Sequence, residues 1–132
     1  MLYERPLHHK FHIARFRDGD TVEGFLECNH CGSIRRDTIR IERIESWEPS
    51  GSTRSEARAV AGALTDRFRG ACGTLTRNTI RRDNHGRITS DIIIGETAIS
   101  LLIVSSGMAW WGVGEPKPEN VNSPIHEVLR DP

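Results

Sequence analysis

Residues 18–21 (Asp-Gly-Asp-Thr) form a turn motif between two runs of alternating apolar residues. The run before the turn, residues 10–17, and the run after it, residues 21–28, have the period of two that indicates β-strands. Glycine adopts backbone dihedrals that other residues avoid, and Asp is common in tight turns. The start of the chain therefore predicts a hairpin that carries two carboxylates at its turn.

A third strand and a helix are expected next. Residues 38–44 alternate as a strand, and a break in the alternation near their acidic end predicts a bulge there. Ser52 or Thr53 could cap a helix that runs to about Arg69, and Glu56 would complete a capping box with Thr53. The apolar stripe of this helix recurs at helical spacing. It consists of Ala57, Val60, Ala61, Leu64 and Phe68.

The second half of the pattern holds a hairpin and a helix. Residues 71–77 and 87–94 predict two paired strands, and residues 97–106 predict a helix. Three strands, a helix, two strands and a helix match a five-stranded Greek-key barrel of the OB type. The expected class is therefore α+β, mainly β, with two to three helices. Residues 113–132 would be a C-terminal tail, in which residues 125–130 could form a short helix.

Composition limits the class of protein more than its function. The chain has 132 residues, which fits one domain, and 18 basic residues balance 18 acidic residues. Bulk charge therefore does not predict a nucleic-acid partner, although arginines cluster within residues 35–43 and 77–87. The absence of a long apolar run and of a leader pattern predicts no contact with a membrane. Three cysteines, an odd number, favour a reducing, cytoplasmic compartment.

Charged side chains gather at the predicted strand ends. Asp18 and Asp20 flank the first turn, while Glu45 and Glu48 follow the third strand, which carries Arg40. A hard cation prefers oxygen ligands, and arginine contacts phosphate with two donors at once. The pattern thus suggests a cation site beside a phosphate site. Taken singly, each residue is more typical of a turn, a solvated loop or a surface ion pair than of such a site.

Cys28 and Cys31 form a Cys-x-x-Cys pair at the turn after the second strand. Such a pair is half of a zinc site, which Cys72 or a nearby histidine could complete. Because the chain has no second Cys-x-x-Cys, the pattern favours a reduced turn over zinc. Trp110 and Trp111 are expected to cover the barrel and the second helix; stacking on a base is the alternative.

Four segments in this order resemble the staphylococcal nuclease-like (thermonuclease) family. They are the Asp-Gly-Asp-Thr turn, the strand and loop at residues 39–48, the Asp-x-x-Gly-Arg turn at residues 83–87, and the helix with Gly-x-Ala at residues 100–109. The resemblance runs from roughly Phe11 to Trp111. It implies an OB-type domain over residues 1–112. It also implies a calcium-dependent phosphodiesterase that acts on DNA or RNA, with Mg²⁺ or Mn²⁺ as alternative cations.

The resemblance also implies a role for each motif residue. Two carboxylates and one carbonyl would bind the cation, and a further carboxylate would lie in its outer shell. These residues are Asp20, Glu45, Ser46 and, in the outer shell, Asp18. Glu48 would orient or activate the water, and Arg40 and Arg87 would bind the phosphate.

Two positions depart from the family pattern. Glu45 stands where the family usually has aspartate, and Trp47 replaces its usual proline. The third helix of the family is also weak or missing. These departures support an alternative function: a catalytically inactive OB module that binds single-stranded nucleic acid or a protein partner.

Overall fold

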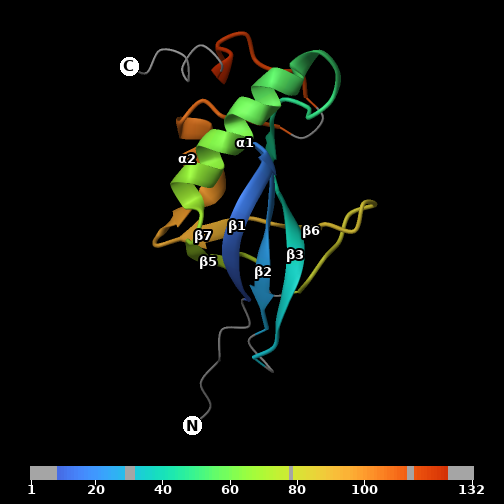
Figure 1. Ribbon diagram of the computed structural model, residues 1–132, viewed down its shortest axis with the longest axis vertical. Helices are drawn as coiled ribbons and strands as arrows, with labels where there is room; N and C mark the ends of the chain where they lie inside the picture. The colour runs from blue at the N-terminus through green and yellow to red at the C-terminus, as the bar shows by residue number, and fades with distance from the viewer. Residues whose placement is uncertain (1–8, 29–31, 78, 113–114, 125–132) are drawn as a thin grey trace.

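A computed structural model describes residues 9–28, 32–77, 79–112 and 115–124, and its class is α+β (Figure 1). Within these residues, seven strands form a mixed sheet of order β6-β3-β2-β1-β5-β7-β8, and β4 pairs with β9. The strands are β1 (Lys10–Asp18), β2 (Thr21–Glu27), β3 (Ile34–Ile41), β4 (Ile44–Glu45), β5 (Cys72–Leu75), β6 (Ile88–Ser90), β7 (Ile92–Ile94), β8 (Thr97–Ala98) and β9 (Trp110–Trp111). The helices are α1 (Arg54–Phe68), α2 (Ile99–Ser105) and the short 3-10 helix η1 (Gly51–Thr53).

The first hairpin has the predicted form. β1 and β2 pair antiparallel, and Asp18 faces Thr21 at the turn. β2 then pairs antiparallel with β3, so that Thr21 also lies opposite Arg40. Apolar side chains of these strands alternate into one core beneath the sheet. The register therefore brings the acidic turn and Arg40 to the same end of three adjacent strands.

The third strand differs from its predicted bounds at both ends. It begins at Ile34, four residues earlier than expected, because Arg35 and Arg36 pair with β2 although they break the apolar alternation. It ends at Ile41, and Arg43 adopts a left-handed backbone with φ of 71° before β4 begins. The predicted bulge is thus a complete break in the strand.

The predicted strand at residues 87–94 is divided into two. Its first half, β6, pairs parallel with β3, whereas its second half, β7, pairs antiparallel with β5. The buried Asp91 separates the halves and accepts hydrogen bonds from the backbone N–H groups of Ile92 and Ser100. The prediction of five strands was therefore wrong in number, because sequence period alone reveals neither this break nor the two-residue strands β4, β8 and β9. The strand order does not close on itself within the described residues.

Helix α1 confirms the predicted helix but not its predicted cap. It crosses one end of β1, β2 and β3 and packs against β1 (Figure 1). Thr65 within it accepts a hydrogen bond from the backbone N–H of Phe16. The hydroxyl of Thr53 makes no cap bond; it bonds instead to the backbone N–H and carbonyl of Glu48. The capping box with Glu56 was therefore wrong.

The second predicted helix is shorter than expected. Residues 97–98 extend the sheet as β8, and α2 occupies Ile99–Ser105. Trp110 is buried edge-on against Trp47, whereas Trp111 is half exposed. The possible helix at residues 125–130 lies outside the described residues. No helix in the described part of the chain combines the length and apolarity needed to cross a bilayer.

Candidate functional site

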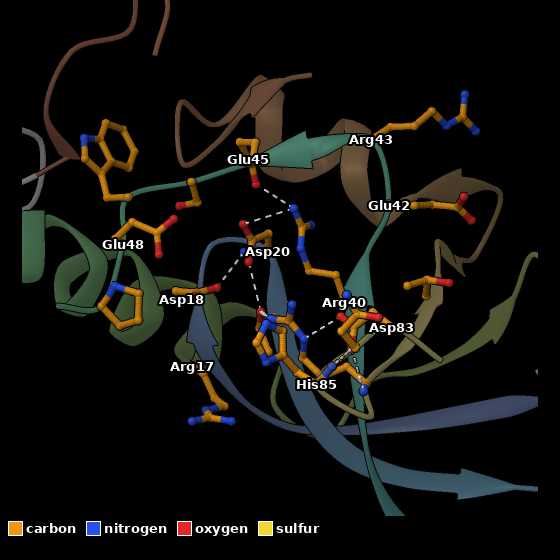
Figure 2. Close-up of a pocket in the computed structure, with 17 residues that line it drawn as sticks. Arg17, Asp18, Asp20, Arg40, Glu42, Arg43, Glu45, Glu48, Asp83 and His85 are labelled. Atoms are coloured by element: carbon orange, nitrogen blue, oxygen red, sulfur yellow. Dashed lines mark hydrogen bonds and ion pairs between the residues drawn. The ribbon is translucent and has the colours of Figure 1, made fainter. Parts of the chain in front are cut away.

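A pocket of about 820 Å³ opens where the β1–β2 turn, the loop after β3 and the turn before β6 meet (Figure 2). Every residue that the sequence analysis assigned to the catalytic or cation site lines it. These residues are Asp18, Asp20, Arg40, Glu45, Ser46, Glu48 and Arg87. Residues separated by almost 70 positions in the chain therefore share one cavity.

Asp18 and Asp20 form a buried acidic pair at the β1–β2 turn. The backbone N–H of Asp20 donates to Asp18 Oδ1 over 3.0 Å, and the Thr21 hydroxyl donates to Asp20 Oδ1 over 2.9 Å. The pKa of Asp20 is raised to about 7, mainly by burial and also by the adjacent Asp18, whereas Arg40 and the Thr21 hydroxyl act in the opposite direction. The pocket wall thus holds a carboxyl group that is costly to ionise unless positive charge lies nearby.

The gap between these two acids requires glycine. A Cβ atom on Gly19 would lie 2.6 Å from the backbone oxygen of Met108 and would overlap the Ser46 hydroxyl. Ser46 itself donates to the Met108 carbonyl over 3.1 Å. The acidic turn therefore packs directly against the loop that carries Ser46.

Arg40 connects the acids of the turn with those of the loop. Its Nη2 atom lies 2.6 Å from Glu45 Oε1 and 3.6 Å from Asp20 Oδ2 (Figure 2). The same guanidinium group donates to the backbone carbonyls of Ile41 and Ile44. These contacts bridge the break between β3 and β4. They hold a guanidinium group, whose side chain is 13 % exposed, at the wall of the pocket.

Arg87 enters the pocket from the turn at residues 83–86. Asp83 organises this turn, since its Oδ1 accepts the backbone N–H groups of His85 and Arg87. Asp83 Oδ2 lies 2.8 Å from Arg87 Nε, and Arg87 Nη1 donates to the Thr21 hydroxyl over 3.3 Å. Thr21 therefore links Arg87 to Asp20. The resemblance named the Asp83 turn, but the orienting role of Asp83 was not predicted.

Glu48 lies apart from the Arg40–Glu45 pair in Figure 2. It is exposed, and its backbone groups are held by Thr53 at the start of α1. Trp47, where the family usually has proline, is buried against Trp110. Indole packing thus anchors the loop, and Glu48 projects at the pocket from this anchored backbone.

The acidic residues fit a hard cation in their chemistry. Burial of Asp20 beside Asp18 produces an electrostatic cost that a divalent cation would remove. Glu45, a third candidate ligand, is engaged by Arg40. Across the described residues, no group of three or more His, Cys, Asp or Glu side chains is arranged to hold a metal ion. The arrangement thus offers two adjacent carboxylates, with a third one paired to arginine.

Sequence reasoning missed several residues of the pocket rim. Arg17 and Arg43 line the pocket, but Figure 2 shows their guanidinium groups directed away from Asp20 and Arg40. His85 also lines it, at the tip of the Asp83 turn. The sequence offered one indication of these residues, which is that they adjoin the motifs. Arg17 directly precedes Asp18, and His85 lies within the Asp-x-x-Gly-Arg turn.

The Cys-x-x-Cys pair is only partly described. Cys28 is a half-buried free thiol at the end of β2, and Cys72 is an exposed free thiol. Cys31 lies outside the described residues, so the choice between zinc and a reduced turn stays a prediction. The chain matches no protein-family model and no curated protein sequence.

Proposed function

We propose that the protein is a metal-dependent phosphodiesterase that hydrolyses DNA or RNA with little sequence preference. One observation carries the proposal: the guanidinium groups of Arg40 and Arg87 line the same pocket as the acids of the β1–β2 turn and of the loop after β3. Phosphoryl chemistry needs both kinds of group, because arginine offsets charge on the phosphate oxygens while carboxylates bind a cation and accept a proton.

The division of labour that we propose is the one that the resemblance to the staphylococcal nuclease-like family implies. Asp20, Glu45 and the Ser46 carbonyl would hold the cation, with Asp18 in its outer shell. Bound Ca²⁺, or Mg²⁺ or Mn²⁺, would supply positive charge for the phosphate and lower the pKa of a water. Glu48, an exposed carboxylate beside the pocket, would accept the proton of the attacking water.

The two arginines would act on the phosphate from different sides. Arg87 is oriented by Asp83, so its remaining N–H donors can point at a non-bridging oxygen. Arg40 is now shared between Glu45 and Asp20. A phosphate group would take over one of these two carboxylate contacts. The P–O bond to the leaving oxygen would break as the water oxygen bonds to phosphorus, and the leaving oxygen would keep the bonding pair and take up a proton from solvent.

We further propose that the sheet is an OB-type arrangement whose fifth strand is interrupted at Asp91. The pairing of β6 with β3 and of β7 with β5 supports this. These two halves would together occupy the position of a single fifth strand between β3 and β5. In that arrangement the acidic turn, the loop after β3 and the turn before β6 lie on one side.

The test is cleavage of plasmid and single-stranded DNA with Ca²⁺ and then with chelator. Arg40→Ala, Arg87→Ala and Glu48→Ala should each lower kcat/KM by about 100-fold or more. Arg58→Ala, an exposed arginine on α1, is the matched control and should retain activity. Because Arg40 also bonds backbone carbonyls, a thermal melt must show that its variants remain folded. Arg40→Lys, which keeps the positive charge, is a second variant for the same activity measurement. A loss of only a few-fold in all three variants would contradict the proposal.

A second candidate function has one observation in its favour. Glu45 pairs with Arg40 at 2.6 Å, so one expected cation ligand is already neutralised by the protein. A module that binds single-stranded nucleic acid or a protein partner without cleaving it would need no cation. Retention of DNA with no cleavage in Ca²⁺, Mg²⁺ or Mn²⁺ would favour this second function.

A further inference from the structure

A thiol, an imidazole and a carboxylate form a row on the solvent-facing side of the sheet. They belong to Cys72 on β5, His12 on β1 and Glu27 on β2, and these three strands are neighbours in the sheet. Phe11, the residue before His12, is fully buried, so the alternation of β1 directs His12 and its cross-strand neighbours to solvent. We call these three residues the thiol row.

The register of β1 and β5 places His12 directly beside Cys72. The two residues face each other in the antiparallel ladder. The Leu75 N–H donates to the His9 carbonyl over 2.8 Å, so that pair is hydrogen-bonded. Since hydrogen-bonded and non-hydrogen-bonded pairs alternate, His12 and Cys72, three pairs further along, form a non-hydrogen-bonded pair. The Cα atoms of such a pair are only about 4.5 Å apart, and its side chains lie on the same face.

Glu27 orients the imidazole of His12. Its Oε1 lies 2.9 Å from His12 Nε2. A carboxylate only accepts hydrogen bonds, so Nε2 of the neutral ring carries the proton and Nδ1 keeps a lone pair. Nδ1 is the ring nitrogen nearer to the backbone of β1, and therefore the one nearer to the short side chain of Cys72. A nucleophile, a base and a third group that orients the base are the parts that activate a thiol.

The thiol of Cys72 is open to solvent and distant from that of Cys28. Cys72 is exposed, and its Sγ lies 4.0 Å from the Gly73 carbonyl, a weak contact that leaves the side chain free to rotate. Cys28 follows β2, which lies on the opposite side of β1 from β5. Two strand spacings amount to about 9–10 Å, whereas the Cα atoms of a disulfide lie within about 7 Å of each other. Cys28 is therefore not a disulfide partner for Cys72.

We propose that the thiol row is a modification site at which Cys72 reacts with low-molecular-weight disulfides. His12 Nδ1 takes the thiol proton, and Cys72 Sγ attacks one sulfur of the disulfide. The S–S bond of the reagent breaks as the new S–S bond forms, and the leaving thiolate takes the proton from His12. The products are a mixed disulfide on Cys72 and one small thiol, and an excess of thiol reverses the reaction. The site is separate from the proposed phosphodiesterase pocket.

The experiment measures the rate at which dithiodipyridine releases its thiol when the protein attacks it. Cys28→Ser and Cys31→Ser together leave Cys72 as the single thiol of the chain. At neutral pH, His12→Ala in this background should lower the rate at least about 10-fold. His12→Gln can still bond to Glu27 but accepts no proton, so it should react as slowly as His12→Ala. Added imidazole should restore part of the rate to His12→Ala.

A second measurement leaves all three cysteines in place. Peptide mapping of the wild-type protein after exposure to oxidised glutathione should locate a mixed disulfide on Cys72, and His12→Ala should carry much less of it. A thermal melt must show that each variant remains folded. Equal rates for wild-type and His12→Ala proteins, or glutathione on Cys72 in equal amounts in both, would overturn the proposal.

Matched variants separate the oriented base from the general charge of this face. Glu27→Gln should slow the reaction, because an amide no longer fixes the proton on Nε2 of His12. Glu23→Gln changes another acid of β2, which pairs with Arg15, and should leave the rate unchanged. Lys10→Ala removes the positive charge on the same face of β1 and should have little effect. The proposal fails if Lys10→Ala slows the reaction as much as His12→Ala does, or if Glu23→Gln and Glu27→Gln act equally.

Discussion

At Asp20, folding favours the protonated carboxyl, whereas the proposed cation site needs the ionised carboxylate. The pKa of Asp20 is raised from 3.8 to about 7, because burial and the adjacent Asp18 disfavour the charged form and Arg40 only partly compensates. The pKa is higher in the folded state than in the unfolded state, so folding favours the protonated carboxyl. The raised pKa of Asp20 therefore adds to the free energy of unfolding in full below about pH 4. This contribution is lost as the pH rises to about 7, because the carboxyl then ionises in the folded protein, and above that pH it is absent.

Asp20→Asn should therefore stabilise the metal-free protein at alkaline pH. The free energy of unfolding in chelator should rise by about 2–4 kcal/mol at pH 8 and change little at pH 4. Asparagine keeps an oxygen that can accept the Thr21 hydroxyl, so the turn itself is preserved. Urea denaturation at the two pH values measures the difference. An equal effect at pH 4 and pH 8 would contradict the assigned cause.

Two glycines differ in whether the surrounding elements leave room for a side chain. Gly19 sits where the β1–β2 turn meets the Ser46 loop, and an added Cβ would clash with a backbone oxygen that cannot rotate away. Gly62 lies within α1, and an added Cβ there would meet no atom within 4 Å. The first glycine is required by packing between elements, whereas the second only weakens its own helix.

Substitution by alanine should separate these two cases. Gly19→Ala should lower the free energy of unfolding by about 2 kcal/mol, because the turn and the loop must move apart. Gly62→Ala should raise it by about 1 kcal/mol, since alanine favours the helix and meets open space. Thermal and urea unfolding measure both changes. If Gly19→Ala is neutral, the acidic turn does not hold the Ser46 loop.

The periodicity of apolar residues predicted strands and helices correctly where one face of the element is buried. The hairpin at Asp18 and helix α1 with its apolar stripe were confirmed because the core selects a period of two or of 3.6. The cap at Thr53 failed because its hydroxyl bonds to the backbone of Glu48, in the loop before the helix, and not to the first turn of α1. Local sequence does not specify which of two nearby partners a hydroxyl will choose.

Across the whole molecule, Asp91 determines how the second half joins the first. Its carboxylate accepts hydrogen bonds from Ile92 and from both the backbone N–H and the hydroxyl of Ser100. These contacts end β6, begin β7 and attach the start of α2 to the sheet. β6 can therefore pair with β3, while β7 pairs with β5.

Asp91→Ala should destabilise the protein by about 3 kcal/mol, because buried donors lose their acceptor. Asp91→Asn keeps one acceptor oxygen and should cost less. Asp66→Ala, at an exposed acid on α1, is the control and should be close to neutral. Urea denaturation measures all three variants. A neutral Asp91→Ala would show that the split strand does not depend on this carboxylate.

By itself, the sequence determined the kinds of element, their order and the acids and arginines placed at their ends. These follow from local periodicity and turn chemistry, which act over a few residues. Tertiary structure alone decided that Arg40 would pair with Glu45, that Asp83 would orient Arg87, and that one predicted strand would divide at Asp91. These outcomes depend on which distant groups burial brings within hydrogen-bonding distance, and no local pattern encodes that distance.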